Sequence, residues 1–412
     1  MVKMNIFSIY PAASCAVGAV LCLAIAYLLS CNKAAISYKN IIFKIFIQLA
    51  LALFLLKTGV GRHILLYLTH ATQTLSAAAQ SGITFIFGQL GSQTGPWGFV
   101  FAFHVLPIIV FFSAFVSALS YVGIIRYLIY VGSLILQPLL GASNSETTCA
   151  LAKSFLGPTE AQLVVRDYLA TMSKSELFAI MVSSLTMISA SLFALYIYMG
   201  VPADHLIAAN CLGIPGSLLF AKIIFPAQHA VQHEAIPDLP QENRAHNLVE
   251  AIIQGTLEGL QLALAIGALL LSFLALISLL DMICVNVGSI FTHKPITFQD
   301  LVGYFFAPFG FLMGLSGHEA LEASELIGIK FFSNEMVAFA KIASKNFSPR
   351  GLALVTYALC GFANISCMGI VVGGIGTLAP KRRADLSNLA WHALLAATLS
   401  NLFSAYLIGI LL

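Results

Sequence analysis

The sequence predicts an all-α, polytopic membrane protein. Hydrophobic residues make up 59% of the 412 residues, charged residues only 9%, and the mean hydropathy is +0.93. A soluble fold carries about 25% charged residues. The apolar residues also run on continuously instead of alternating, which argues against a β-barrel. The protein is therefore expected to cross the membrane with helices.

The apolar runs define the spans. A helix needs roughly 20 mainly apolar residues to cross a bilayer. A shorter candidate, 41–56, could extend past Lys57, and seven segments are long enough: 8–30, 98–120, 176–200, 205–225, 252–280, 352–372 and 386–412. The first run resembles a signal peptide, but so many spans follow that we expect it to be a transmembrane helix.

Basic residues orient these helices. Lys33, Lys39 and Lys44 follow the first span, and the KRR sequence at 381–383 precedes the last. The positive-inside rule places both loops in the cytoplasm. Both termini then face outward and the number of full spans is even, about eight, in a multi-pass protein of the cytoplasmic (inner) membrane. Lys57 and Arg62 fall on the outer side, against the rule.

The two halves of the chain have a similar order of features. Glu160, in the sequence GPTE, lies 28 residues before Ile188, and Glu335, in SNE, lies 29 residues before Asn364. Ile188 and Asn364 each fall among small and polar residues in mid-span. Interrupted segments in matching places of two halves are typical of inverted-repeat transporters with a site near the membrane midplane.

The sequence around Gly157 and Pro158 predicts a re-entrant hairpin. Proline lacks an N–H and clashes with the preceding turn, so this pair cannot continue a helix. Irregular backbone at membrane depth persists only where it is buried in protein or lines a wet cavity. A hairpin that enters and returns on one side satisfies both conditions, and helix ends at its tip can bind a solute or cation.

These features divide the chain into four parts. We expect N-terminal scaffold helices and an interfacial segment at 1–95; a first repeat at 96–225, with a hairpin near 144–170 and a broken span at 175–200; a polar loop at 226–250; and a second repeat at 251–412, with a hairpin near 302–343, a broken span at 350–373 and a last span at 386–412. In the loop, His229 and His233 have an i,i+4 spacing that suits a metal on a helix, but its three prolines favour a solvated loop.

Polar residues inside spans are the functional candidates. An ionisable residue costs about 2.5–3.5 kcal/mol at the centre of a span. Glu160 and Glu335 could accept hydrogen bonds from sugar hydroxyls or base N–H groups, or carry a proton; the alternative is that they cap hairpin helices. Asn364 offers two donors and an acceptor, or else joins two helices. Four other glutamates are expected at interfaces or hairpin ends: Glu146, Glu319, Glu322 and Glu325.

Several function classes lack their motifs. Residues 373–376 are glycine-rich but have no P-loop lysine, so the energy source is an ion gradient, or the solute runs downhill. The sequence has no basic run suited to nucleic acid. The eight cysteines form no CxxC pair, which excludes a disulfide framework or metal cluster. Neither a nucleophile–base pair nor HExxH is present, so an enzyme is not expected.

Five stretches carry a resemblance to a known family. They are GFVFAFHVLPIIVFFSAFVSALSYVG (98–123), GPTEAQLVVRDYL (157–169), KFFSNEMVAFAKI (330–342), SPRGLALVTYALCGFANISCMGIVVGGIGTLAP (348–380) and KRRADL (381–386). With these motifs the chain resembles the concentrative nucleoside transporters, such as bacterial nucleoside permeases, over nearly its whole length. The resemblance implies eight spans plus two re-entrant hairpins, a homotrimer with scaffold and elevator-type transport domains, and nucleoside uptake with Na⁺ or H⁺.

The resemblance also implies a ribose site. Glu335 and Asn364 match the residues that bind ribose hydroxyls, and Cys367 stands where the family commonly has a ribose-contacting serine. Phe362 matches an aromatic residue beside the substrate. Two further residues complete the predicted substrate site: Leu192 and Asn334.

The base-facing side departs from the family. Gly157, Thr159 and Glu160 match the first-hairpin motif that faces the nucleobase. The family motif usually reads Gly-Gln-Thr-Glu, and Pro158 replaces the glutamine here. A side-chain amide that could read the base edge is therefore lost, and we expect altered base selectivity.

The cation site departs further. Lys153 stands where sodium-coupled members have an asparagine, and Met187 where they have a serine. Carbonyls near Leu156 and Ile188 could remain, but a fixed positive charge repels Na⁺ strongly in a low dielectric. We predict that the Lys153 ammonium occupies the vacant sodium position and bonds to these carbonyls, unless it snorkels to the cytoplasmic interface.

Coupling to H⁺, with Glu160 or Glu335 as carrier, is then favoured over coupling to Na⁺, and no cofactor is expected. Three other functions stay open: a Na⁺-coupled symporter, a transporter of a modified nucleoside or other ribosyl solute, and a channel-like or regulatory protein that keeps the fold without pumping.

Overall fold

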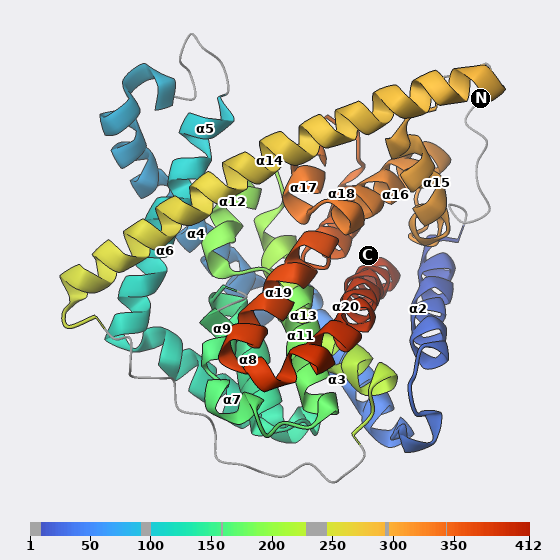
Figure 1. The fold of residues 1–412 in the computed structure, drawn as a ribbon, viewed down its shortest axis with the longest axis horizontal. Helices are drawn as coiled ribbons and strands as arrows, with labels where there is room; N and C mark the ends of the chain where they lie inside the picture. The colour runs from blue at the N-terminus through green and yellow to red at the C-terminus, as the bar shows by residue number, and fades with distance from the viewer. Residues whose placement is uncertain (1–9, 92–99, 158–159, 228–244, 293–295, 343) are drawn as a thin grey trace.

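The computed structural model describes residues 10–91, 100–157, 160–227, 245–292, 296–342 and 344–412. Every regular element in these ranges is helical, as the sequence predicts (Figure 1). The helices of eight or more residues are α2 (Pro11–Leu28), α3 (Tyr38–Lys57), α4 (Gly59–Phe87), α6 (Leu106–Val122), α7 (Ile124–Leu140), α8 (Asn144–Phe155), α11 (Lys174–Thr186), α13 (Ala203–Ile224), α14 (Leu248–Thr292), α15 (Phe298–Phe311), α16 (Gly317–Phe332), α17 (Glu335–Ile342), α18 (Pro349–Leu359), α19 (Ile365–Leu378) and α20 (Arg383–Leu411).

Seven helical segments of the described chain are long and apolar enough to cross a membrane, which confirms the polytopic class. They correspond to six of the seven full-length spans predicted from the sequence and to the shorter candidate 41–56. The remaining predicted span, 352–372, is divided between α18 and α19 because the chain leaves the helical conformation at 360–364. Neither half is long enough to cross alone.

Three of the long helices lie in the core. Most of α11, α13 and α20 is buried, whereas only a minority of the residues in α2, α3, α6 and α14 are buried. Helix α20 packs against α2, α11, α13 and α18. Small residues make these contacts close: a Cβ at Gly216 would lie 2.7 Å from Ser400 Oγ, and one at Gly18 would lie 2.8 Å from the Tyr406 ring. Membrane helices commonly associate through such small residues.

Helix α14 runs obliquely across the whole molecule (Figure 1) and packs along α6. Two glycines one turn apart bring the helices together. A Cβ at Gly255 would lie 2.5 Å from Ser117 Cβ, and one at Gly259 would lie 2.7 Å from Ser113 Cβ. This contact fixes which face of α14 points toward α6.

Polar side chains start the helices that border the site. Ser143 caps α8 and Ser173 caps α11, each with a glutamate three residues later that bonds back to the cap amide. This reciprocal pair is the capping box expected of an S-x-x-E sequence. Ser348 caps α18 and Asn364 caps α19. The sequence thus fixes where each half-helix begins.

Candidate functional site

Two spans that are broken at mid-length meet at the centre of the site. One comprises α11 and the short α12 (Phe193–Tyr198), the other α18 and α19. Asn401 on α20 joins the breaks: its Nδ2 donates to the Thr186 carbonyl at 2.9 Å and to the Cys360 carbonyl at 2.7 Å. Gly361 approaches Thr186 so closely that a Cβ would overlap the carbonyl oxygen. The asparagine satisfies carbonyls that the helix ends leave free.

A second asparagine, Asn210 on α13, ties the first hairpin to the first break. Its Oδ1 accepts a hydrogen bond from the Ile188 amide at 3.0 Å, and its Nδ2 donates to the Ser154 carbonyl at 3.3 Å. Met187 is fully buried beside them, and its sulfur accepts from Ser154 Oγ at 3.4 Å. Leu156 ends α8. The predicted cation positions therefore lie at one junction between hairpin and break.

Lys153 is fully buried, so it does not snorkel to an interface. Its ammonium lies 4.3 Å from the centroid of the Phe362 ring, a cation–π contact between the first hairpin and the second break. The expected bonds to backbone carbonyls are not formed: Nζ has no hydrogen-bond partner among the described residues. The aromatic ring takes the place predicted for the carbonyl oxygens.

Glu335, Asn364 and Cys367 form one hydrogen-bonded chain. Asn364 Nδ2 donates to Glu335 Oε2 at 2.8 Å, and its Oδ1 accepts from the Cys367 amide at 2.7 Å. Glu335 Oε1 accepts from the Tyr196 hydroxyl at 3.1 Å. Glu335 and Asn364 are at most 1% exposed. The two residues predicted to bind ribose thus contact each other and fix each other's orientation.

The remaining predicted residues border this chain. Asn334 caps the start of α17, its Oδ1 accepting from the Val337 amide at 2.9 Å. Leu192 is buried at the first break, Phe362 is buried at the second, and Cys367 is half-buried in the first turn of α19.

The tip of the first hairpin lies beside a cavity. Helix α8 ends at Phe155, and the chain becomes helical again at Glu160, in α9 (Glu160–Leu163). Glu160 is exposed, lines the cavity, and accepts from the Gly157 amide at 3.1 Å. Its carboxylate therefore binds the backbone of Gly157 and lies beside the cavity at once. Pro158 and Thr159 lie outside the described residues, as do His229 and His233.

Sequence reasoning missed Tyr196 and Lys330. Tyr196 is fully buried on α12, its ring centroid 4.6 Å from that of Phe339. Its position in the apolar run FALYIY gave no signal. Lys330 Nζ donates to the Ala358 carbonyl at 2.9 Å and to Asn401 Oδ1 at 3.0 Å. Lys153 and Lys330 each lie two residues before the end of the first helix of their hairpin, which is α8 for Lys153 and α16 for Lys330. That matching position could have revealed Lys330.

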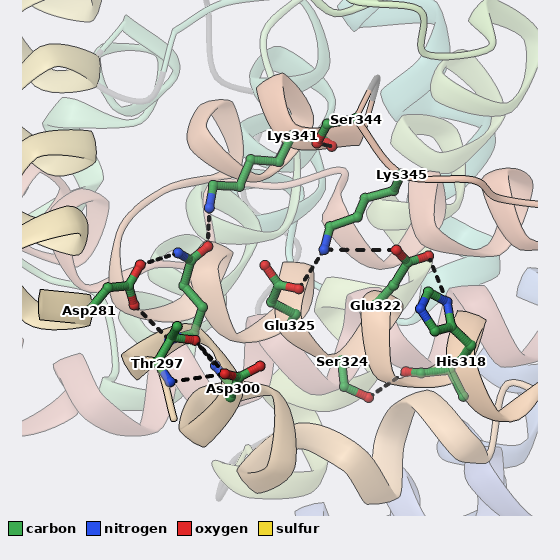
Figure 2. Close-up of polar contacts among 12 residues, drawn as sticks. Asp281, Thr297, Asp300, His318, Glu322, Ser324, Glu325, Lys341, Ser344 and Lys345 are labelled. Carbon is green, nitrogen blue, oxygen red and sulfur yellow. Dashed lines mark hydrogen bonds and ion pairs between the residues drawn. The ribbon is translucent and has the colours of Figure 1, made fainter. Parts of the chain in front are cut away.

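The other glutamates hold helix ends. Glu146 caps α8 and pairs with Lys222 on α13, and Glu319 accepts from the Ser348 amide at 2.8 Å. At the base of the second hairpin, Lys345 bonds to Glu325 at 2.6 Å (Figure 2). The same lysine lies 3.9 Å from Glu322.

Figure 2 also shows how α14 is joined to this base. Asp281 on α14 binds the side chain of Gln299, which in turn binds Lys341 on α17. These groups and the glutamates beside them act as structural ties and do not face the breaks. In the described part of the chain no three His, Cys, Asp or Glu side chains gather as a metal site.

Three family models match nearly the whole chain. The Na⁺ dependent nucleoside transporter N-terminus matches residues 17–90, nucleoside recognition matches 102–203, and the Na⁺ dependent nucleoside transporter C-terminus matches 205–409. Fold and matches define a multi-pass transporter of the cytoplasmic membrane, not an enzyme. The chain belongs to the family of concentrative nucleoside transporters that its motifs resemble.

Similar proteins and solved structures support the same family. The nucleoside permease NupC of Helicobacter pylori is 36% identical, over 100% of this chain and 98% of the permease. An uncharacterized transporter of Haemophilus influenzae is 41% identical over 95% and 96%. Human solute carrier family 28 member 3 is 32% identical, over 96% of this chain and 59% of its own length. The inward-facing, substrate-bound structure of CNTnw has 38% identity and a TM-score of 0.90, over 97% and 98% of the two chains.

Proposed function

We propose that the protein is a secondary active symporter that takes up nucleosides. The buried Glu335–Asn364 pair is the observation that carries this proposal. A carboxylate and an amide, held 2.8 Å apart between a hairpin and a helix break, offer acceptors and donors to adjacent ribose hydroxyls. Cys367 and Asn334 border the ribose, and Phe362 and Leu192 border the nucleobase.

The base faces the first hairpin, at Gly157, Pro158, Thr159 and Glu160. Gly157 and Glu160 line the cavity that opens there. Pro158 brings no amide to this position, which supports altered base selectivity and keeps a modified nucleoside or other ribosyl solute as a second candidate.

Coupling is to H⁺ in preference to Na⁺. The support is Lys153, a fully buried residue of α8 three positions before Leu156, whose ammonium lies against the Phe362 ring. A charge there repels a cation strongly, because the interaction of two charges at about 4 Å is worth several kcal/mol at an effective dielectric of about 20. Glu160 or Glu335 carries the proton. The Na⁺ dependence in the family's description favours the competing candidate, a Na⁺ symporter.

The mobile part comprises both hairpins and both broken spans, which Asn210 and Asn401 tie together, in line with the two repeats expected at 96–225 and 251–412. The N-terminal helices with α6 and α14 form a fixed scaffold. We infer an elevator motion of one part against the other, in a homotrimer.

Uptake into proteoliposomes tests the proposal. Labelled uridine should accumulate above its equilibrium level when an inward H⁺ gradient is imposed, with or without Na⁺. Accumulation that needs a Na⁺ gradient at constant pH would overturn H⁺ coupling. Equilibration without accumulation under either gradient would favour a channel-like protein.

A further inference from the structure

A half-enclosed cavity of about 270 Å³ separates the tip of the first hairpin from helices α6 and α14. Leu156, Gly157 and Glu160 form its hairpin wall, and Ser191 adds the edge of the first break. Six polar residues of the two helices line the opposite wall, among them Ser113, Ser117, Gln254 and Glu258. Because Gly157 and Glu160 also belong to the proposed base site, a bound nucleoside would extend its base toward this opposite wall.

The packing of α14 places Gln254 and Glu258 on that wall. Gly255 and Gly259 face α6 at close range. Gln254 and Glu258 each precede one of these glycines by one residue, and they are four residues apart, so they form a stripe along the neighbouring face of the helix. The glycine contact therefore fixes the rotation that turns a carboxylate and an amide toward the hairpin.

Glu258 is free to bind a solute. It has no hydrogen bond or ion pair with any residue that the structure describes, and it lines the same cavity as Glu160. A glutamate within a span is costly and is functional by default. Arg126 and Arg166 also line the cavity, so its lining carries both signs of charge. The cavity therefore suits an uncharged solute that donates hydrogen bonds.

We propose that Glu258, with Gln254 beside it, is a second base contact that selects nucleosides carrying an exocyclic amino group. This inference rests on the proposed nucleoside transport. A carboxylate only accepts hydrogen bonds, so the amino group of cytidine or adenosine binds it, whereas the carbonyl of uridine or inosine at the same place meets it with lone pairs. A site built to accept a donor rejects an analogue that lacks it.

Competition against labelled adenosine uptake in proteoliposomes tests the contact. Unlabelled cytidine should compete about tenfold better than unlabelled uridine with the unchanged protein, as expected for one hydrogen bond to a charged group. The Glu258→Gln variant should bring the two close to parity, because an amide can also donate to the uridine carbonyl. Asp281→Asn is the matched control, since it removes a carboxylate from α14 about 34 Å farther along the helix. It should keep the tenfold ratio.

A second measurement is independent of transport. Cytidine should raise the thermal unfolding temperature of the purified protein more than uridine does, and Glu258→Gln should abolish the difference while remaining folded. An unchanged cytidine-to-uridine ratio in Glu258→Gln, or a preference for uridine in the unchanged protein, overturns the inference and leaves nucleoside transport standing. No uptake of any nucleoside by the unchanged protein would overturn the proposed function, and this inference with it.

Discussion

Replacing Tyr196 by phenylalanine should weaken nucleoside binding through Glu335. The substitution keeps the ring against Phe339, 4.6 Å away, and removes only the hydroxyl that donates to Glu335 Oε1 at 3.1 Å. Tyr196 is fully buried and Glu335 is 1% exposed, so water has little room to replace the donor. A hydrogen bond to a charged group contributes about 1.5–3 kcal/mol. If most of this hydrogen-bond free energy serves to orient Glu335, its loss weakens uridine binding about ten- to a hundredfold.

Uridine and 3′-deoxyuridine, compared as competitors of uptake, show whether the effect passes through the ribose site. The unchanged protein should reject the deoxy analogue, because a buried partner of the missing hydroxyl is left unpaired. In Tyr196→Phe the preference should shrink, since a misplaced Glu335 no longer binds the hydroxyl well. Tyr357→Phe is the control: this tyrosine is equally buried and bonds to His205, 3.4 Å away. Uridine affinity within twofold of the unchanged protein, with full rejection of the deoxy analogue, would refute the reasoning.

Three further substitutions test other parts of the site. Lys153→Asn removes the fixed charge and adds an amide oxygen, so uridine uptake should become Na⁺-stimulated; uptake that stays indifferent to Na⁺ would count against the assignment of this position. Cys367→Ser introduces a stronger hydrogen-bonding group beside the ribose, and the uridine KM should fall about two- to tenfold; an unchanged KM would place residue 367 out of reach of the sugar. Gly361→Ala puts a Cβ into the Thr186 carbonyl and should lower the thermal unfolding temperature, whereas Gly369→Ala, with open space around it, should not. Equal stability of the two alanine variants would contradict the close crossing of the breaks.

The sequence located the helices and breaks because each depends on local chemistry. Helix α8 ends at Phe155, just before the predicted break at Gly157 and Pro158, and an N-capping residue such as Ser173 starts a helix. Glu335 and Asn364 became candidates for a similar reason: a carboxylate and an amide in apolar surroundings stand out, and a nearly equal spacing separates Glu160 from Ile188 in the first half.

The contacts between these elements could not be predicted. Lys153 was expected beside carbonyls and instead lies against Phe362, more than 200 positions later in the chain, because only the assembled site decides which neighbour fills the space. Tyr196 belongs to an apolar run in which its hydroxyl carries no pattern. Its role appears only when α12 packs against α17. Gln254 and Glu258 likewise line the cavity only because of the rotation of α14, which the sequence alone does not reveal.

The hydrogen-bonded chain of Tyr196, Glu335, Asn364 and Cys367 has a consequence for the carrier when it is empty. Its donors and acceptors already satisfy one another without a solute. In the elevator motion proposed above, a bare carboxylate would have to stay hydrated on its way back through the bilayer, at a large cost in free energy. With its partners in place, the unloaded protein can reset without carrying water along. Solute binding then exchanges one set of hydrogen bonds for another, which favours moderate affinity and rapid release on the far side.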